Sequence, residues 1–436
     1  MADDEQYDFA ILGTGLVECA IGCILAENNK KVILIDRNAM YGSDYATLRY
    51  SELESHFGSE EAIPELKVYD NEFCVDLTPK LFLADSKMLR MLVEHGIDEY
   101  LEFCRIPGSF LWKGKLYSVP TSETQSMTTG MIGMWQKPKV MRFFWNVREY
   151  AKAAMKGAGY KFKATMRDEF KEYGLSEESM ELIGHGIALN LDDSYLDRNP
   201  KETFDKIITY IKSIVCYENA MESPYLYPRY GLSEIAQGFA RSCCMKGGEI
   251  MINAEVLSVN ESSAEIFVRE PVNKEMLRIK ATKIISDQSY FKRSAVEYEI
   301  IRAICVIRGE PCEVTRGASS SQIIFLKGEM RRRNDIFVVV LGCDEKATPD
   351  GYKVAIISTV KETSDPASEI KTVVGKLGDV VKTFMEVKPV YRAEDTENVI
   401  FTKGVNESPH FEDVYDEIEE ICRKLNLKSA GCGEKA

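Results

Sequence analysis

The sequence predicts a mixed α/β protein in which a helical segment interrupts a domain built from several β-sheets. Three observations support this fold class. A strand, glycine turn, helix and strand open the chain, helical periodicity dominates from about residue 121 to residue 222, and short apolar runs typical of strands return after Glu249. With 436 residues, the chain is long enough for roughly two or three domains with ordinary hydrophobic cores.

Composition and charge exclude several classes of protein. Lysine and arginine number 55 against 69 aspartate and glutamate residues, so the formal net charge is −14. An acidic surface repels phosphate backbones and anionic membranes, and we therefore expect no nucleic-acid partner. The hydrophobic fraction of 45% and the charged fraction of 28% are typical of globular proteins, which argues against long disorder and against a coiled coil.

The N-terminus, the cysteines and the histidines indicate a cytoplasmic protein without a metal site. The N-terminus is acidic, unlike that of a signal peptide, and no run approaches the roughly 18 apolar residues of a membrane span. The 12 cysteines include no Cys-x-x-Cys pair, so we expect reduced thiols. The histidines, which are His56, His95, His185 and His410, are too dispersed to suggest metal ligands.

The chain opens with a pattern typical of a Rossmann-type βαβ unit. An apolar run over residues 9–12 precedes a glycine turn, an apolar-periodic stretch continues to about Glu27, and a second apolar run covers residues 32–35. Asp36 ends the second strand 23 residues after Gly13, near the spacing at which an acidic residue binds a ribose hydroxyl. We therefore predict an FAD/NAD(P)-binding-like fold for this domain.

The third position of the glycine fingerprint indicates that the cofactor site is vestigial. Glu18 stands where glycine or alanine would let the helix and the strand pack closely, and it lies in the first helical turn, where a pyrophosphate would otherwise bind. A dinucleotide at Gly13 and Gly15 would meet both bulk and like charge, so we expect no cofactor and interpret Asp36 as part of the same vestigial turn. The alternative is that Glu18 points to solvent and a flavin still binds.

The C-terminal half supports the same interpretation. Flavoproteins of this architecture usually close the cofactor site with a Gly-Asp pair near the C-terminus. The only such pair in this chain is Gly378-Asp379, which lies inside a predicted helix from Glu369 to Met385.

The middle of the chain is predicted to be helical. Apolar residues at helical spacing predict helices over residues 166–173, 180–191 and 201–216, the second of them weakened by two glycines. The stretch from Met127 to Trp145 is unusually rich in methionine and aromatic residues and carries two of the three tryptophans. Methionine is over-used on permissive apolar binding surfaces, although plain core packing is the simpler interpretation of this stretch.

Six strands are predicted after the helical segment, over residues 250–259, 264–268, 277–285, 322–326, 336–341 and 353–360. We therefore divide the chain into a discontinuous multi-sheet domain of residues 1–120 and 223–426, an inserted helical domain of residues 121–222, and a flexible tail of residues 427–436.

Several longer motifs carry a resemblance to a known family. They are Gly-Thr-Gly-Leu-Val-Glu at residues 13–18, Val-Asp-Leu-Thr-Pro-Lys at 75–80, Val-Pro-Thr-Ser-Glu-Thr at 119–124, Asp-Asp-Ser-Tyr-Leu-Asp at 192–197 and Ser-Pro-Tyr-Leu-Tyr-Pro-Arg-Tyr-Gly-Leu at 223–232. Together they resemble the Rab GDP-dissociation inhibitors from about Tyr7 to Leu425. That family is similar in fold to FAD-dependent monooxygenases and oxidases but does not work as one, and Glu18 is its usual residue at the glycine turn.

The resemblance implies a binding protein rather than an enzyme, with no catalytic residues. Members of the family hold prenylated Rab GTPases in the GDP form, slow the release of GDP, and carry the GTPases between membrane and cytosol. We therefore expect as partners prenylated GDP-bound Rab GTPases, their geranylgeranyl lipid and, transiently, a membrane. We also expect the chain to act as a monomer.

The resemblance also implies three groups of site residues. The GTPase-binding platform corresponds to Tyr41, Glu234, Gln237, Arg241 and Met251. A mobile loop that takes part in membrane recognition corresponds to Asn219, Glu222 and Tyr225, although the family commonly carries a more basic segment just before Ser223. In the helical segment, where the family binds prenyl groups, the pocket candidates are Met127, Met131, Met134, Phe143, Phe144, Ile207 and Ile211.

Two other functions compete with this interpretation. The βαβ opening is compatible with a flavin-dependent amine oxidase, which bound flavin would reveal. A Rab escort protein, which presents unprenylated Rab to the geranylgeranyl transferase, is similar in fold but tends to be considerably longer.

Overall fold

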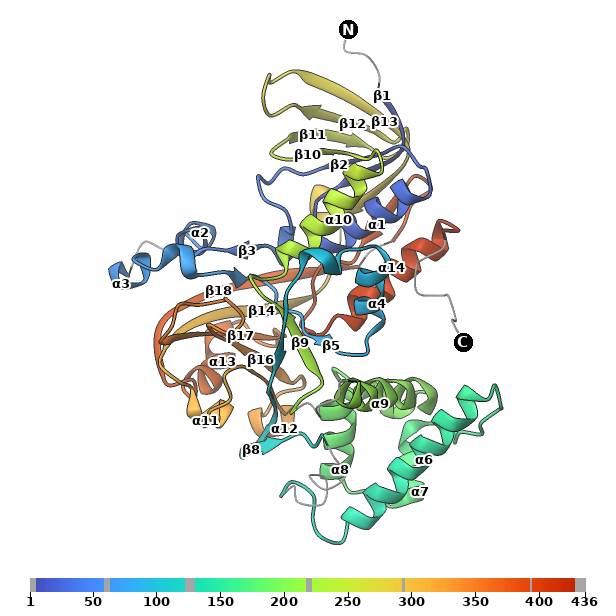
Figure 1. Cartoon of the computed structure of the whole chain (residues 1–436), viewed down its shortest axis with the longest axis vertical. Helices are drawn as coiled ribbons and strands as arrows, with labels where there is room; N and C mark the ends of the chain where they lie inside the picture. The colour runs from blue at the N-terminus through green and yellow to red at the C-terminus, as the bar shows by residue number, and fades with distance from the viewer. Residues whose placement is uncertain are drawn as a thin grey trace.

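The structure is a computed structural model that describes residues 5–58, 63–121, 130–216, 222–291, 295–392 and 394–427. Two seven-stranded sheets and a lobe of helices follow one another along the long axis of the molecule (Figure 1). We call residues 130–216 the helical lobe. The predicted mixed α/β fold class is confirmed. No helix in the described part of the chain combines the length and the apolar character that a membrane span requires.

The first sheet contains β1 (Glu5–Leu12), β2 (Val32–Ile35), β10 (Glu249–Met251), β11 (Glu255–Asn260), β12 (Glu265–Arg269), β13 (Met276–Asp287) and β19 (Val399–Thr402). Its parallel part joins β10 to β2, β2 to β1, β1 to β13 and β13 to β19. The antiparallel strands β12 and β11 extend the sheet beyond β13. The predicted βαβ opening is therefore the centre of this sheet.

The second sheet runs in the order β18 (Asp379–Arg392), β14 (Ala295–Arg308), β17 (Tyr352–Val360), β16 (Ile336–Leu341), β15 (Ser321–Phe325), β7 (Gly108–Lys113) and β8 (Lys115–Ser118). All six residues of β16 are buried, as expected for a strand covered on both faces. Two small sheets pair β3 (Thr47–Leu48) with β4 (Val75–Asp76), and β9 (Tyr225–Pro228) with β5 (Phe82–Leu83) and β6 (Phe103–Ile106).

The α-helices of the sheet-bearing part are α1 (Leu16–Glu27), α2 (Tyr50–His56), α3 (Pro64–Lys67), α4 (Lys87–Glu94), α10 (Ser233–Met245), α11 (Cys312–Thr315), α12 (Lys327–Met330), α13 (Pro366–Val374) and α14 (Glu412–Lys424). Helices α10 and α14 both pack against α1, which is almost entirely buried. The helical lobe contains α6 (Lys137–Met155), α7 (Met166–Tyr173), α8 (Glu177–Glu181) and α9 (Pro200–Val215).

Two of the helices predicted for the lobe are confirmed, as α7 and α9, while the third differs in kind. Helix α8 covers only five residues and continues as a π-helix over Leu182–Ile187. Gly184 lies in this π-helix, and a Cβ there would lie 1.9 Å from the hydroxyl oxygen of Tyr195. The hydroxyl of Tyr195 lies so close to the backbone at residue 184 that only glycine fits there. The glycine that weakened the helix prediction is therefore required by packing.

The helix predicted from Glu369 to Met385 is wrong. Helix α13 ends at Val374, Gly378 has a φ of +84°, and strand β18 begins at Asp379. β18 pairs along its length with β14, a strand that the sequence analysis did not predict. Long-range pairing with β14 outweighs the local helical spacing, so the Gly378-Asp379 pair lies at a turn into a strand.

Ion pairs attach the helical lobe to the second sheet. Lys113 of β7 lies 2.7 Å from Glu181, and the ring of His185 lies 2.8 Å from Asp335 on one side and 3.1 Å from Asp193 on the other. His185 and Asp335 are almost completely buried. His185 therefore connects the π-helix of the lobe with the segment that leads into β16.

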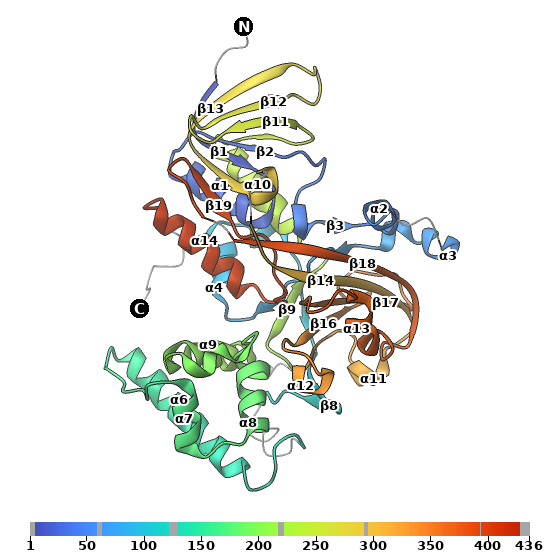
Figure 2. The same cartoon turned by 180° about the vertical axis from the view of Figure 1, so that it is seen from behind.

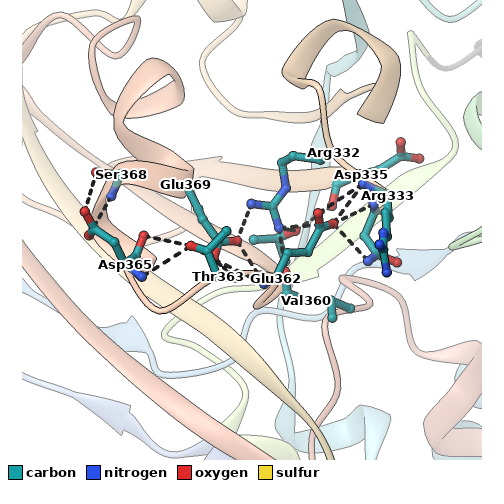
Figure 3. Close-up of polar contacts among 11 residues, drawn as sticks. Arg332, Arg333, Asp335, Val360, Glu362, Thr363, Asp365, Ser368 and Glu369 are labelled. Atoms are coloured by element: carbon teal, nitrogen blue, oxygen red, sulfur yellow. Dashed lines mark hydrogen bonds and ion pairs between the residues drawn. The ribbon is translucent and has the colours of Figure 1, made fainter.

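A polar cluster fixes the segment that carries Asp335. Figure 3 shows the guanidinium of Arg332 between Glu369 and Glu362, with which it forms two ion pairs. The second carboxylate oxygen of Asp335 accepts a hydrogen bond of 2.8 Å from the backbone N–H of Lys327. These contacts hold both Arg332 and Asp335 in place. The carboxylate of Asp335 is therefore fixed in position beside His185.

The charge state of His185 follows from these contacts. Burial lowers the pKa of His185, but its contacts with Asp193 and Asp335 outweigh burial and raise the pKa from 6.5 to about 9. The stabilisation from the imidazolium is thus complete below pH 6.5 and is lost as the pH rises through about 9.

We predict that the fold loses stability between about pH 6.5 and pH 9.5 because His185 loses its proton. The difference between the two pKa values corresponds to about 3 kcal/mol in the free energy of unfolding. The midpoint of thermal unfolding, measured at both pH values, tests this. His185→Gln should reduce the pH-dependent difference, and His56→Gln, at a more exposed histidine, should keep it. The same pH dependence in all three proteins would contradict the assignment.

Candidate functional site

A cleft of about 950 Å³ opens beside the carboxyl ends of the parallel strands in the first sheet. Segments that directly follow β2, β13 and β19 line it, together with part of β18. Doubly wound folds bind their ligands at this edge of the sheet. The cleft is therefore the place to test whether the residues present fit a dinucleotide.

Glu18 occupies the phosphate end of this edge. Gly13 has a φ of +108° and Gly15 caps helix α1, as the fingerprint predicts. A Cβ on Gly15 would lie 2.3 Å from Oε2 of Glu18, so the carboxyl group folds back over the turn. The hydroxyl of Thr402 donates a 2.6 Å hydrogen bond to Oε1. The side chain is 6% exposed, so the interpretation that Glu18 points to solvent is wrong.

Burial determines the charge of Glu18. It raises the pKa of the carboxyl group from 4.5 to about 8, although the hydrogen bond from Thr402 opposes the shift. The group is therefore largely protonated at neutral pH. The obstacle that it presents to a pyrophosphate is mainly steric rather than the like charge that the sequence suggested.

Asp36 is also committed to contacts within the chain. Oδ2 accepts hydrogen bonds from the backbone N–H and the hydroxyl of Thr14, at 2.7 and 2.6 Å. Oδ1 accepts from the backbone N–H of Asn38 at 2.7 Å and from the hydroxyl of Tyr290 at 3.4 Å. A ribose hydroxyl would have to displace these donors. The residues at the turn therefore do not fit a bound dinucleotide.

The predicted platform residues lie on or beside α10. Glu234, Gln237 and Arg241 recur at spacings of three and four, which places them on one side of the helix, and they are exposed or half-buried while the opposite side is buried. Met251 ends β10, and its carbonyl accepts a hydrogen bond from the backbone N–H of Asp36. Tyr41 lies in the turn after β2 and is half-buried. Their role in binding stays a prediction.

Asp76 positions the start of α10. Its buried carboxylate accepts hydrogen bonds from the hydroxyl of Thr47 at 2.5 Å, from the hydroxyl of Tyr227, and from the backbone N–H of Leu232 at 2.8 Å. Gly231 has a φ of +94°, and a Cβ there would lie 2.4 Å from Thr47. The motifs at residues 75–80 and 223–232 are thus joined in space by one carboxylate.

Two further aromatic residues at the platform were not predicted. The guanidinium of Arg241 lies over the ring of Tyr100, 4.8 Å from its centroid. Tyr230, which precedes α10 at a φ of +66°, is 51% exposed. Exposed tyrosines are common interface anchors, but only the fold brings Tyr100 next to residues more than 130 positions away.

The prenyl-pocket candidates divide into buried and exposed groups. Phe143 and Ile207 are fully buried, and Phe143 packs against the rings of Phe144, Phe170, Tyr173 and Phe204. Met131 is also buried, whereas Met134 is 78% and Ile211 40% exposed. Met127 lies outside the described residues. Phe143 and Ile207 therefore belong to the packed interior of the lobe.

The mobile-loop candidates need one correction. Tyr225 lies in β9, between β5 and β6, and is completely buried with its ring stacked on His410. Its assignment to a mobile loop is therefore wrong, because backbone pairing on both sides and ring stacking hold it. Glu222 is exposed, and Asn219 lies outside the described residues.

One group of possible metal ligands is brought together by the fold. Cys23, Glu27 and His95 each contribute one possible ligand atom, and these three atoms lie within 4.8 Å of one another. Lys246 forms an ion pair with the carboxylate of Glu27, and its nitrogen lies 4.0 Å from Sγ of Cys23. Contacts with Cys23 and Glu27 outweigh burial and raise the pKa of His95 to about 9. Protonated His95 and Lys246 thus supply the positive charge at this position.

Comparison with known proteins agrees with the motifs. The family model described as GDP dissociation inhibitor matches residues 3–431. The probable secretory pathway GDP dissociation inhibitor 1 of Schizosaccharomyces pombe is 34% identical over 432 residues, which cover 97% of this chain and 96% of that protein. The Rab GDP dissociation inhibitor beta of Rattus norvegicus is 31% identical, with 97% of this chain and 95% of that protein covered.

Solved structures support the predicted fold. The crystal structure of Rab GDI from Plasmodium falciparum has a TM-score of 0.87 at 27% identity and covers 97% of this chain and 98% of that chain. Putrescine oxidase bound to putrescine has a TM-score of 0.52 at 11% identity and covers 97% of this chain and 99% of that chain. The second likeness concerns the fold alone, and it confirms that the fold is FAD-binding-like.

We predict that Glu18→Gln loses less stability between pH 5 and pH 8 than the unmodified chain does. Because the pKa of Glu18 is raised from 4.5 to about 8 in the fold, the native chain loses stability across this range, and an amide that cannot ionise removes the loss. The midpoint of thermal unfolding should therefore fall less with pH in Glu18→Gln than in the unmodified chain. Glu94→Gln, at an exposed position on α4, should leave the pH dependence unchanged. A steeper fall in Glu18→Gln would contradict burial of a neutral carboxyl group.

Proposed function

This chain belongs to the GDP dissociation inhibitor family, as its motifs predicted, and we propose that it binds prenylated Rab GTPases in their GDP-bound form. In this proposal the chain slows the release of GDP and carries the GTPase between membrane and cytosol. It acts as a binding protein rather than an enzyme, and as a monomer. The names of the two relatives and of the solved structure support this assignment.

The outer side of α10 is the observation that carries the proposal. It offers a carboxylate at Glu234, an amide at Gln237 and a guanidinium at Arg241 from one rigid helix. The ring of exposed Tyr100 lies against the guanidinium of Arg241, and exposed Tyr230 precedes the helix. Tyrosine and arginine are the residue types that most often dominate interface energies.

Retention of GDP follows if this surface binds one arrangement of the GTPase switch segments. A partner shifts a conformational equilibrium only by its difference in affinity for the two states. A platform held rigid by Asp76 and by packing on α1 is suited to such discrimination, because it cannot adapt equally well to both arrangements. We therefore propose that the platform selects the GDP-bound arrangement.

The lipid requires a second surface. Two geranylgeranyl chains hold roughly 40 carbons, and at about 0.8 kcal/mol per buried CH₂ a membrane holds them with up to roughly 30 kcal/mol. We propose that the helical lobe supplies comparable apolar cover by separation of α6 from α9. The aromatic cluster around Phe143 then becomes the wall of the pocket.

The flavin amine oxidase alternative is not favoured. Glu18 fills the phosphate end of the turn, and Asp36 is saturated by donors of the chain itself. The absorbance spectrum of the purified protein separates the two functions. A flavin band at near-stoichiometric intensity would overturn the proposal.

We predict that Arg241→Ala weakens capture of a doubly prenylated GDP-bound Rab by about tenfold or more, as expected for an interface anchor. The fold should stay intact, because Arg241 is exposed and exposed substitutions rarely cost much stability. Capture is measured by titration with the GDP-bound and GTP-bound forms, and thermal unfolding monitors the fold.

Arg392→Ala is the matched control, because Arg392 is an exposed arginine at the end of β18 in the other sheet. It should bind like the unmodified chain. Unchanged affinity in Arg241→Ala would remove Arg241 from the platform, and equal capture of the GDP-bound and GTP-bound forms would contradict the proposed function itself.

A further inference from the structure

One segment of the helical lobe, residues 130–175, reverses the charge of the rest of the chain. Residues 130–175 contain ten lysines and arginines and four aspartates and glutamates, so this segment carries 10 − 4 = +6 within a chain of −14. The remainder therefore carries −14 − 6 = −20. The negative net charge of the whole chain argues against anionic partners, but it does not describe this part of the surface.

Helix α6 separates its residues into a core face and an outer face. Val140, Phe143, Val147 and Tyr150 are buried. On the opposite face Arg142, Trp145, Arg148, Lys152 and Lys156 are exposed, the last of these directly after the helix. The only acidic residue in α6 is Glu149, which pairs with Lys152 at 2.6 Å. The outer face therefore offers a basic stripe about 21 Å long from Arg142 to Lys156.

Large apolar side chains interrupt this stripe. Trp135 and Met134 precede α6 and are 87% and 78% exposed, Trp145 lies in its middle at 63%, and Met155 ends it at 77%. Tryptophan is seldom so exposed without a partner. The third tryptophan, Trp112 of β7, is 7% exposed. We call Trp135, Arg142, Trp145, Arg148 and Lys152 the α6 patch.

We propose that the α6 patch docks on a lipid bilayer surface rich in anionic headgroups. Lysine and arginine on the polar side and tryptophan at the interface are the combination that holds an amphipathic helix on such a surface. This inference rests on the proposed function, which brings the chain to membranes, and it names the surface that makes the contact.

The charge distribution also orients the whole molecule. Helix α14, which lines a cleft together with α9 on the side of the helical lobe that faces the sheets, contains six acidic residues among its 13, and an anionic bilayer repels it. Both views place α6 on the side of the helical lobe away from the two sheets, where a flat surface can reach it (Figures 1 and 2). The chain therefore approaches the membrane with the helical lobe first.

Tryptophan fluorescence tests the contact directly, because two of the three tryptophans lie in the α6 patch and Trp112 is buried. We expect vesicles of phosphatidylserine and phosphatidylcholine to shift the emission of the full chain to shorter wavelength. Pure phosphatidylcholine vesicles should not, and 1 M salt, where the Debye length is about 3 Å, should abolish the shift. The W135F/W145F variant, which keeps only Trp112, should show no shift.

Charge reversal tests the role of the basic stripe. R142E/R148E/K152E should lower the partition coefficient onto phosphatidylserine vesicles in a sedimentation assay by about tenfold or more. The control K30E/K274E/K346E reverses three exposed lysines outside the lobe and gives the same net charge of −14 − 6 = −20. We expect a loss of less than about threefold in the control.

Several outcomes would overturn the proposal. They are equal binding to neutral vesicles, unchanged partition of the patch variant, and an equal loss in the two triple variants. An emission shift produced by polyglutamate but not by vesicles would assign the surface to an acidic protein instead. Capture of prenylated GDP-bound Rab in solution is measured in parallel and should be the same in all variants. Failure of capture in the unmodified chain would contradict the proposed function, whereas loss of vesicle binding alone concerns only the α6 patch.

Discussion

The buried carboxylate of Asp76 ties together the segments on which the candidate binding surface depends. It joins β3, β4, β9 and the first turn of α10 through three hydrogen bonds, and its burial raises its own pKa to about 6. A carboxylate without water must find its donors in the chain, and here the donors come from residues 47, 227 and 232. The position of the outer side of α10 therefore depends on the buried hydrogen bonds of Asp76 and not on the helix alone.

A second buried carboxyl group explains how a cofactor fold can serve a different purpose. Glu18 takes the space above Gly15 and reaches Thr402 of β19, so the chain itself fills the end of the crevice that a pyrophosphate would need. The parallel strands and the glycine turn are both present in the first sheet. The chain can share the fold of an oxidase and still lack space for a pyrophosphate at the glycine turn. Function depends on the residues of the site and not on the fold that carries them.

The helical lobe and the sheets differ in both charge and attachment. The lobe is joined to the sheet-bearing part by ion pairs, among them His185 with Asp335, and by apolar packing such as that of Tyr210 on Tyr225, instead of by a continuous sheet. Its interior is aromatic, while its outer face is basic. The proposed lipid site therefore lies in the lobe, and the proposed GTPase platform on α10 lies in the sheet-bearing part.

The sequence by itself determined the βαβ opening, the obstructing Glu18, the helices α7 and α9 and the resemblance to the family, because each rests on spacings within a few residues or on contiguous motifs. Only the tertiary structure decided that β18 is a strand, that Tyr225 is buried, and that Tyr100 lies under Arg241. It likewise joined Cys23 and Glu27 to His95. These features depend on contacts between segments that lie tens to hundreds of residues apart in the sequence. The energies of such contacts outweigh local conformational preference, and the contacts produce no periodic pattern in the sequence.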